Sequence, residues 1–491
     1  MRIVFVAAEC EPFAKAGGLA DVVDALARAL GRVPGALDEP VEVFLPRYRG
    51  VSVPADVAVA TRVVPLPDPH APRGLAAAAI LTVAANGYRL RLVDVPAAFD
   101  RDGYYGDANG DFSDNEWRFG LLCRAAIETR RAEGRPIDVL AAHDWHACPA
   151  ILQRDLVYAA DPLVGPTAAV LTVHNPAYHG WVGRDRVVGL GLGVGGEGVG
   201  AEWGIDLLAE GIRRAELVNT VSPGYAREVL GPEHGRGLDG EFRARGARFF
   251  GILNGLDTTL WDPATDGVIA APYDRADRSG KAACRADLLG RLGMDPADPG
   301  PVIGVVGRLD PQKGFDLVAA AAARLVARGV RLVVLGSGDA GLVSAARTLA
   351  TARPDRLALV ERFDRDQARR IYAGADLFLM PSRFEPCGQS QMIALRYGTP
   401  PIARRTGGLA DTIVDVDESP ATGTGFLFDG LTPEALAAAV ERAVALFAAP
   451  DRSRWERLVE RGMVVDFSWE TGSAPRYVDA YRRAIALRRG R

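Results

Sequence analysis

The chain has 491 residues, of which 48% are hydrophobic and 24% charged, and its 58 basic and 62 acidic side chains give a net charge of −4. This length and composition predict two or three globular domains, each able to bury a core of its own. The near-neutral charge argues against nucleic acid or an anionic membrane as the main partner, and the longest apolar run, 75–85, is too short to span a membrane.

The N-terminal segment and the cysteines bear on where the protein works. Residues 2–9 (RIVFVAAE) lose their apolar character at Glu9, which predicts a first β-strand rather than a signal peptide. The five cysteines are odd in number, scattered along the chain and without CxxC spacing. This pattern favours reduced thiols in a cytoplasmic protein that has no structural zinc.

Short β-rich runs alternate with helical patterns along most of the chain. The strands that we expect are 2–9, 41–46, 89–96, 138–144, 168–174 and 217–222 in a first block, and 302–309, 331–338, 356–363, 376–382 and 400–406 in a second. Such alternation predicts an α/β fold with doubly wound parallel sheets, whose ligands bind outside the carboxyl ends of the strands.

The two blocks set the expected domains. We place the first domain at 1–255 and the second at 256–466, with a stretch rich in Pro, Gly and Asp between the blocks that contains one helix at 278–292. The last segment, 467–491, has amphipathic helical spacing. We expect this final helix to pack back on the first domain.

Lysine is rare in this chain. Of the 58 basic residues only Lys15, Lys281 and Lys313 are lysines, and the other 55 are arginines. Against that background a retained lysine suggests a place where a compact ammonium is needed and a planar guanidinium is not. Lys15 comes shortly before Gly17 and Lys313 directly before Gly314, although three lysines could also fall near glycines by chance.

The pentapeptide GGLAD occurs twice, at 17–21 and 407–411, and each copy is expected to end a loop and begin a helix. Glycines let the backbone approach a ligand closely, and a helix N-terminus offers free N–H groups with a partial positive charge. With Lys15 beside the first copy, this pattern predicts a phosphate or phosphosugar site. An ordinary strand–loop–helix connection with a solvated lysine is the alternative.

In the second block, several strands end in polar or glycine-rich loops. Arg308 and Lys313 follow one strand, so they could converge on a single diphosphate or simply form surface ion pairs. Gly336-Ser337 follows the next strand and is typical of a nucleotide-facing turn. Glu385, in the loop SRFEPCGQSQ, could direct a carboxylate at sugar hydroxyls while the amides after it face a phosphate.

Two further patterns suggest ligand sites and are rejected. His143 and His146 have a metal-like spacing, but no third ligand accompanies them, so sugar contact or core packing is favoured for these side chains and for His174. The letters GxGxxG at 191–196 match a dinucleotide fingerprint. They lie within a glycine-dense loop, 189–200, instead of between a strand and a helix.

A dozen motifs in one order cover nearly the whole chain, among them AECEPFAKAGGLADVV, AAHDWHA, TVHNPAYHG, GRLDPQKG, LGSGD, SRFEPCG and RYGTPPIARRTGGLADT. In these motifs the chain resembles bacterial glycogen synthases and plant starch synthases, which are retaining glucosyltransferases of the GT-B type. The resemblance implies two Rossmann-like domains facing each other across a deep cleft and a reaction without metal or cofactor. The implied donor is ADP-glucose, and the implied acceptor is the non-reducing end of glycogen or another α-1,4-glucan. UDP-glucose as donor, or another retaining GT-B transferase with a smaller acceptor, stays an alternative, and the oligomeric state stays open.

The resemblance also implies residue roles. The catalytic set comprises Lys15, Asp144, His174, Arg308, Lys313 and Glu385. The donor-binding set comprises Lys15, Gly17, Gly18, Arg308, Lys313, Gly336, Ser337, Phe363, Cys387, Gly388, Gln389, Ser390, Gly407 and Gly408. In this set Arg308 and Lys313 would neutralise the diphosphate, and Glu385 would hold hydroxyls of the transferred glucose. Phe363, Gln389 and Ser390 depart from the tyrosine, leucine and threonine that are usual in the family, and Ala209 stands where a lysine is common.

Overall fold

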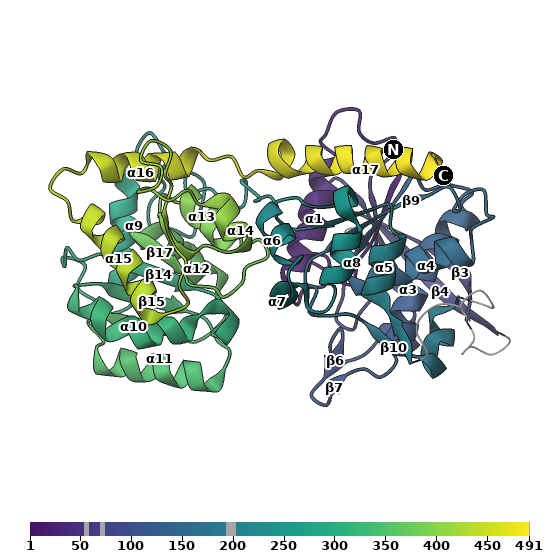
Figure 1. Ribbon diagram of the computed structural model, residues 1–491, viewed down its shortest axis with the longest axis horizontal. Helices are drawn as coiled ribbons and strands as arrows, with labels where there is room; N and C mark the ends of the chain where they lie inside the picture. The colour runs from purple at the N-terminus through teal and green to yellow at the C-terminus, as the bar shows by residue number, and fades with distance from the viewer. Residues whose placement is uncertain (54–57, 69–73, 193–202, 491) are drawn as a thin grey trace. The chain divides into compact units, whose positions relative to one another are not determined.

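The computed structural model describes residues 1–53, 58–68, 74–192 and 203–490. The chain forms two compact units, which are described separately here (Figure 1). Unit 1 consists of Met1–Gly255 together with Trp469–Arg491, and unit 2 is Leu256–Ser468. The first crossing between them lies at the expected 255/256 boundary, and the second lies at 468/469, two residues beyond the expected one.

Within the described residues, unit 1 contains a nine-stranded sheet in the order β13-β12-β9-β8-β1-β2-β5-β4-β3. The strands are β1 (Ile3–Val6), β2 (Glu42–Pro46), β3 (Val59–Pro67), β4 (Leu75–Ala84), β5 (Arg89–Asp94), β8 (Val139–His143), β9 (Ala168–Val173), β12 (Leu217–Thr220) and β13 (Phe249–Gly251). All neighbours pair in parallel except that β4 runs antiparallel to both β3 and β5. Two short antiparallel pairs stand outside this sheet: the hairpin of β6 (Gly106–Asp107) and β7 (Gly110–Asp111), and β10 (Trp181–Gly183) with β11 (Gly204–Asp206).

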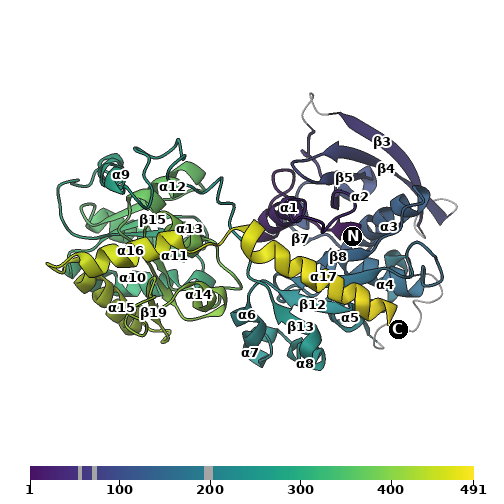
Figure 2. The same ribbon diagram turned by 90° about the horizontal axis from the view of Figure 1, so that it is seen from above.

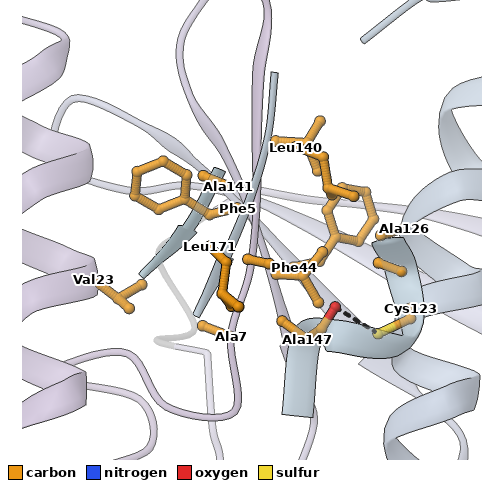
Figure 3. Packing of buried hydrophobic residues seen from close by; sticks show 14 of the residues in the cluster. Phe5, Ala7, Val23, Phe44, Cys123, Ala126, Leu140, Ala141, Ala147 and Leu171 are labelled. Atoms are coloured by element: carbon orange, nitrogen blue, oxygen red, sulfur yellow. Dashed lines mark hydrogen bonds between the residues drawn. The ribbon is translucent and has the colours of Figure 1, made fainter. Parts of the chain in front are cut away.

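The helices of unit 1 are α1 (Gly18–Leu30), α2 (Pro96–Phe99), α3 (Asn115–Ala132), α4 (Cys148–Leu156), α5 (Leu207–Arg214), α6 (Pro223–Glu228), α7 (Pro232–Gly235), α8 (Asp239–Ala244) and α17 (Ala474–Arg489). The core forms where fully buried strand residues meet the helices. Figure 3 shows Phe5, Phe44 and Leu140 from three neighbouring strands packed with Cys123 and Ala126 of α3.

The last helix completes unit 1. In Figure 2 the yellow helix α17 lies over the unit 1 sheet, and it contacts β8, β9 and α1. Tyr477 and Tyr481 are fully buried on its inner side, and Arg488 lies 3.4 Å from the buried carboxylate of Glu216. The apolar face of α17 is thus part of the unit 1 core.

Unit 2, all of whose residues are described, contains a six-stranded parallel sheet in the order β16-β15-β14-β17-β18-β19. Its strands are β14 (Val302–Val306), β15 (Arg331–Leu335), β16 (Leu357–Val360), β17 (Leu377–Met380), β18 (Pro401–Arg404) and β19 (Phe426–Phe428). Its helices are α9 (Ser279–Arg291), α10 (Phe315–Ala327), α11 (Ala340–Ala352), α12 (Arg365–Gly374), α13 (Ser390–Arg396), α14 (Gly407–Thr412), α15 (Pro433–Phe447) and α16 (Ser453–Val464). Helices α10 and α15 pack on one face of the sheet and α9 and α12 on the other, as Figure 2 also shows.

The fold class expected from the sequence is confirmed: both sheets are parallel at their centres, with crossover helices. Each expected strand is present; β2 ends with the run that predicted it, and each of the others ends one to three residues earlier than its run. The hairpin formed by β3 and β4 was not expected, nor were the short strands β13 and β19. None of the described helices is long and apolar enough to cross a membrane.

Candidate active site

The pocket of unit 2 that is lined by Arg308 and Lys313 lies where the order of the strands reverses. From β14 the chain winds outward through β15 to β16, and it then returns to β17 on the other side of β14. Such a switch point leaves a crevice at the carboxyl ends of the two strands, where α/β proteins bind their ligands. A pocket of about 100 Å³ opens there, lined among others by Arg308, Lys313, Ser382 and Ser390.

Lys313 and Glu385 form an ion pair at this pocket. The Lys313 Nζ atom lies 2.6 Å from Glu385 Oε2, which also accepts a hydrogen bond of 3.0 Å from the hydroxyl of Ser382. Glu385 is almost fully buried, whereas the Lys313 side chain is partly exposed. A buried carboxylate needs such partners, so the loop after β17 is attached to the loop after β14 at the point where both meet the pocket.

Arg308 is held only loosely. Its guanidinium is 70% exposed, 3.3 Å from Asp310 and 3.4 Å from the side-chain oxygen of Gln312. An exposed pair of this kind contributes little to stability. Arg308 can therefore exchange these partners for an anionic ligand at small cost.

Three glycines allow the loops around the pocket to touch. A Cβ atom on Gly408 would lie 2.1 Å from the carbonyl oxygen of Cys387, and the Gly408 amide donates to the Glu385 carbonyl at 3.0 Å. A Cβ on Gly336 would lie 1.9 Å from the Gly307 oxygen, and one on Gly314 2.1 Å from the Pro381 oxygen. Only glycine permits these approaches.

The two GGLAD copies therefore differ in what they require. Both begin a helix, α1 and α14, as expected. Around Gly17 and Gly18, however, nothing lies within 4 Å of an added Cβ. In the second copy, Gly408 lets its backbone pack against the loop that carries Glu385. In the first copy, Gly17 and Gly18 have no such close contact.

Other residues of the expected donor set lie along the same edge of the unit 2 sheet without lining the pocket. Ser337 follows β15, and its carbonyl accepts from the Leu309 amide at 3.0 Å. Phe363 follows β16 and is 85% exposed. Gln389 is the residue before α13 and makes no side-chain cap.

Unit 1 has its own switch point between β1 and β8, at the loop that carries Lys15. Its ammonium lies 2.6 Å from Asp21 and 3.3 Å from Glu11. Beside it is a recess of about 480 Å³, lined by Lys15, Ala16, Tyr104 and Tyr105 and by the β6–β7 hairpin.

The expectation that free backbone amides precede α1 is wrong for two of them. The Ala16 and Gly17 amides donate to Oε2 of the buried Glu9 at 2.6 and 2.8 Å, and Tyr105 donates to the other oxygen at 2.5 Å. An anion of the chain itself therefore occupies these donors. Gly17 shapes the loop through this contact, and Lys15 remains the cation there.

Asp144 lies at the carboxyl end of β8 in a strained backbone conformation, with φ 58° and ψ −176°. Its carboxylate accepts a hydrogen bond of 2.7 Å from the His174 amide, which joins the carboxyl ends of β8 and β9. Burial raises the pKa of Asp144 to about 7. A carboxyl whose pKa is raised toward neutrality at a switch point makes Asp144 a candidate functional residue.

The three histidines that the sequence singled out, His143, His146 and His174, pack against other rings. The rings of His143 and His174 approach to 3.0 Å between Nδ1 and Nε2, and burial lowers the pKa of both, that of His143 to about 3. His146 packs against Tyr105 and Phe119. Among the described residues no group of three His, Cys, Asp or Glu side chains is placed to hold a metal ion. Of the GxGxxG letters at 191–196, Gly191 ends a short 3₁₀ helix, and Gly193 and Gly196 lie outside the described residues.

Sequence reasoning missed three contributors to these sites. Glu9 and Tyr105 hold the Lys15 loop, and Ser382 supports Glu385. The available signal for Glu9 and Ser382 was a polar residue at the end of a run that predicts a strand, 2–9 and 376–382. Tyr105 had none, because its partner is 96 residues away.

Comparison with known proteins agrees with this architecture. Residues 2–244 match the starch synthase catalytic domain family, and residues 300–445 match the family described as glycosyl transferases group 1. The glycogen synthase of Syntrophotalea carbinolica is 39% identical, with 99% of each chain covered, and that of Anaeromyxobacter dehalogenans is 42% identical, with 98% of this chain and 99% of the relative covered.

Solved structures support the same assignment. The catalytic domain of starch synthase IV from Arabidopsis thaliana, bound to ADP and acarbose, superposes with a TM-score of 0.87 at 33% identity over 99% of both chains. Sucrose-phosphate synthase from Thermosynechococcus elongatus, at 19% identity and a TM-score of 0.59 over 99% of both chains, shares the fold. With whole-length relatives of one activity, and two Rossmann-like units carrying the motifs of that group, the chain belongs to the glycogen synthase family of glycosyltransferases.

Proposed function

We propose that the protein transfers glucose, with retention, from ADP-glucose to the non-reducing end of an α-1,4-glucan such as glycogen. The observation that carries this proposal is the group of Arg308, Lys313 and Glu385 at the switch-point pocket of unit 2. The starch synthase IV structure, solved with ADP and the oligosaccharide analogue acarbose, supports a nucleotide donor and a glucan acceptor. The five cysteines, all in the described part of the chain, are buried and form no disulfide, which supports a reducing, cytoplasmic setting.

The proposed chemistry needs no metal. Breaking the bond between glucose and the diphosphate places negative charge on the leaving oxygen and positive charge on the anomeric carbon. Arg308 and Lys313 would stabilise the leaving diphosphate, as preorganised donors do in other enzymes. Glu385 would hold hydroxyls of the transferred glucose, Lys15 would add positive charge at the donor, and Asp144 and His174 would position the sugar.

The donor is tested by incubating the purified protein with glycogen and either labelled ADP-glucose or labelled UDP-glucose in EDTA. We expect incorporation into polymer from ADP-glucose at a rate that EDTA does not change. Faster incorporation from UDP-glucose would contradict the proposed donor. Loss of activity in EDTA, restored by a divalent cation, would contradict the metal-free reaction.

The pocket is tested by Lys313→Ala and Glu385→Gln. Each should lower kcat/KM for the donor roughly 10²- to 10³-fold, the usual effect of removing one preorganised donor. Because the two side chains share a contact of 2.6 Å, the double variant should lose much less than the product of the single losses. Arg291→Ala, which breaks an exposed ion pair on α9, is the control and should keep full activity. Near-normal turnover in either single variant would rule out this assignment.

A further inference from the structure

The third lysine of the chain lies outside the pocket, on α9. The Lys281 Nζ atom donates to the carbonyl oxygens of Ala373 and Tyr397, both at 3.0 Å, and to the hydroxyl of Thr399 at 2.7 Å. The Tyr372 carbonyl oxygen lies further away, at 3.5 Å. Acceptors gathered around a single nitrogen suit an ammonium, with its three N–H bonds on one atom, better than a planar guanidinium. This explains why a chain with 55 arginines has a lysine here.

The carbonyl acceptors come from the ends of two helices. Ala373 lies in the last turn of α12, and Tyr397 is the residue that ends α13. Helix C-termini have unpaired carbonyls and a partial negative charge, so two of them close together repel each other unless a cation lies between. Lys281 supplies that cation and joins α9, α12 and α13. Burial lowers the pKa of its ammonium to about 8.

The opposite end of α13 meets the pocket. Ser390, its first residue, lines the pocket together with Arg308 and Lys313. Helix α13 has only seven residues, so a shift of its carboxyl end moves Ser390 at its other end as well.

We propose that Lys281 is a positioning residue for the donor pocket: by holding the carboxyl ends of α12 and α13 together, it sets the place of Ser390 and of the loop 385–388 that leads into α13. Lys281 itself touches none of the residues that line the pocket. The inference rests on the proposed function only in taking this pocket as the nucleotide-sugar site.

The test compares Lys281→Met and Lys281→Arg with Leu289→Ala, which removes a fully buried side chain on the same helix and serves as the control for lost stability. Binding of ADP is measured by calorimetry, donor kinetics with ADP-glucose and glycogen, and amide hydrogen exchange at residues 387–391 and in β14. All variants are made in the full chain.

We expect Lys281→Met to bind ADP at least tenfold more weakly, with KM for the donor raised by a similar factor and KM for glycogen unchanged. Amides 387–391 should exchange at least tenfold faster while β14 exchanges as before. Lys281→Arg should not restore ADP binding, because it keeps the charge but not the three-fold geometry. Leu289→Ala should lower the melting temperature and leave ADP binding within twofold.

Two results would overturn the inference: ADP binding within twofold of the unchanged chain in Lys281→Met, or unchanged exchange at 387–391. If the unchanged chain binds UDP and not ADP, the proposed donor is wrong, and the variants are compared in UDP binding instead. The hydrogen-exchange measurement needs no nucleotide, so it tests the inference in either case. Should Lys281→Met fail to fold, Thr399→Val removes one acceptor of the Lys281 ammonium and keeps the shape of the side chain. It should weaken nucleotide binding at least threefold, and unchanged binding would overturn the inference.

Discussion

Asp144 combines two features that lower the stability of the folded chain. Its φ of 58° with ψ of −176° lies in a region that only glycine adopts readily, at a cost of about 1–3 kcal/mol. Burial of its carboxyl raises the pKa to about 7, so the charged form is unfavourable in the fold. Strain and unfavourable burial in one residue are typical of positions kept for function.

The raised pKa predicts how stability depends on pH at this residue. Between about pH 4 and pH 7 the folded chain holds a proton at Asp144 that the unfolded chain has released, so this group lowers stability as pH rises through that range. Asp144→Asn, which keeps an oxygen for the His174 amide, should be more stable than the unchanged chain at pH 8, by up to about 4 kcal/mol for a shift of three units. Near pH 4 the two should be equally stable, as urea unfolding would show.

The substitution that raises stability should lower activity. Asp144→Asn should lower glucose transfer about tenfold or more, because a sugar-positioning carboxylate is lost. Asp479→Asn, an 80% exposed position on α17, is the control and should leave both stability and transfer unchanged. An Asp144 variant whose stability gain is the same at pH 4 and pH 8 would contradict the raised pKa.

At the scale of single residues, the sequence pointed to candidate site residues but not to their contacts. Lys313 and Glu385 could be recognised from the loops that they occupy, yet the pair they form joins positions 72 residues apart. That pair depends on β14 and β17 being neighbours, which no local pattern encodes. The Glu9 contact with the Ala16 and Gly17 amides was missed for a related reason: a carboxylate and a free amide both suit a helix start, and only the fold shows that they meet.

Among the elements, the connection between β14 and α10 is set by one glycine. Gly314 has φ +69°, and an added Cβ would lie 2.1 Å from the Pro381 carbonyl oxygen. Gly329, after α10, has φ +78° but nothing within 4 Å of an added Cβ. The two positions share the backbone conformation and differ only in their surroundings.

Gly314→Ala should therefore cost more than Gly329→Ala. Each places a side chain in left-handed backbone, at about 1–2 kcal/mol. In Gly314→Ala the connection between β14 and α10 must also move away from Pro381, and Lys313 moves with it. The kcat/KM of this variant for the donor should therefore fall at least about tenfold. Thermal unfolding and initial rates would show both effects, and equal losses in the two variants would contradict the role given to the Pro381 contact.

The elements that the sequence did not predict share a physical cause. The run 75–85 is rich in alanine, which favours strands weakly, so β4 showed no β signal and its antiparallel pairing with β3 went unnoticed. Strands β13 and β19 have three residues each, too few for periodicity to distinguish. The central parallel strands, fully buried and rich in Val, Ile and Leu, were predictable for the opposite reason.

At the scale of the whole molecule, the chain leaves unit 1 at Gly255 and returns to it at Trp469. Trp469 packs closely over Gly255, since an added Cβ on that glycine would lie 2.6 Å from the indole. The returning segment continues into α17, whose tyrosines are part of the unit 1 core. Amphipathic spacing predicted this helix, but its contacts with β8, β9 and α1 could be seen only in the fold.

The stability of unit 1 should therefore depend on the end of the chain, while that of unit 2 should not. Tyr481 is fully buried on α17, so Tyr481→Ala should destabilise unit 1 by about 3–5 kcal/mol, the usual cost of emptying an aromatic site. Within the described residues the Tyr481 hydroxyl has no hydrogen-bond partner, so Tyr481→Phe, the matched control, should be neutral or slightly stabilising. Hydrogen exchange in low denaturant, followed separately in β8 and in β14, distinguishes the units: faster exchange in β8 alone is expected, because the contacts of α17 lie in unit 1. Equal acceleration in β14 would show that the two units unfold together and that α17 stabilises both.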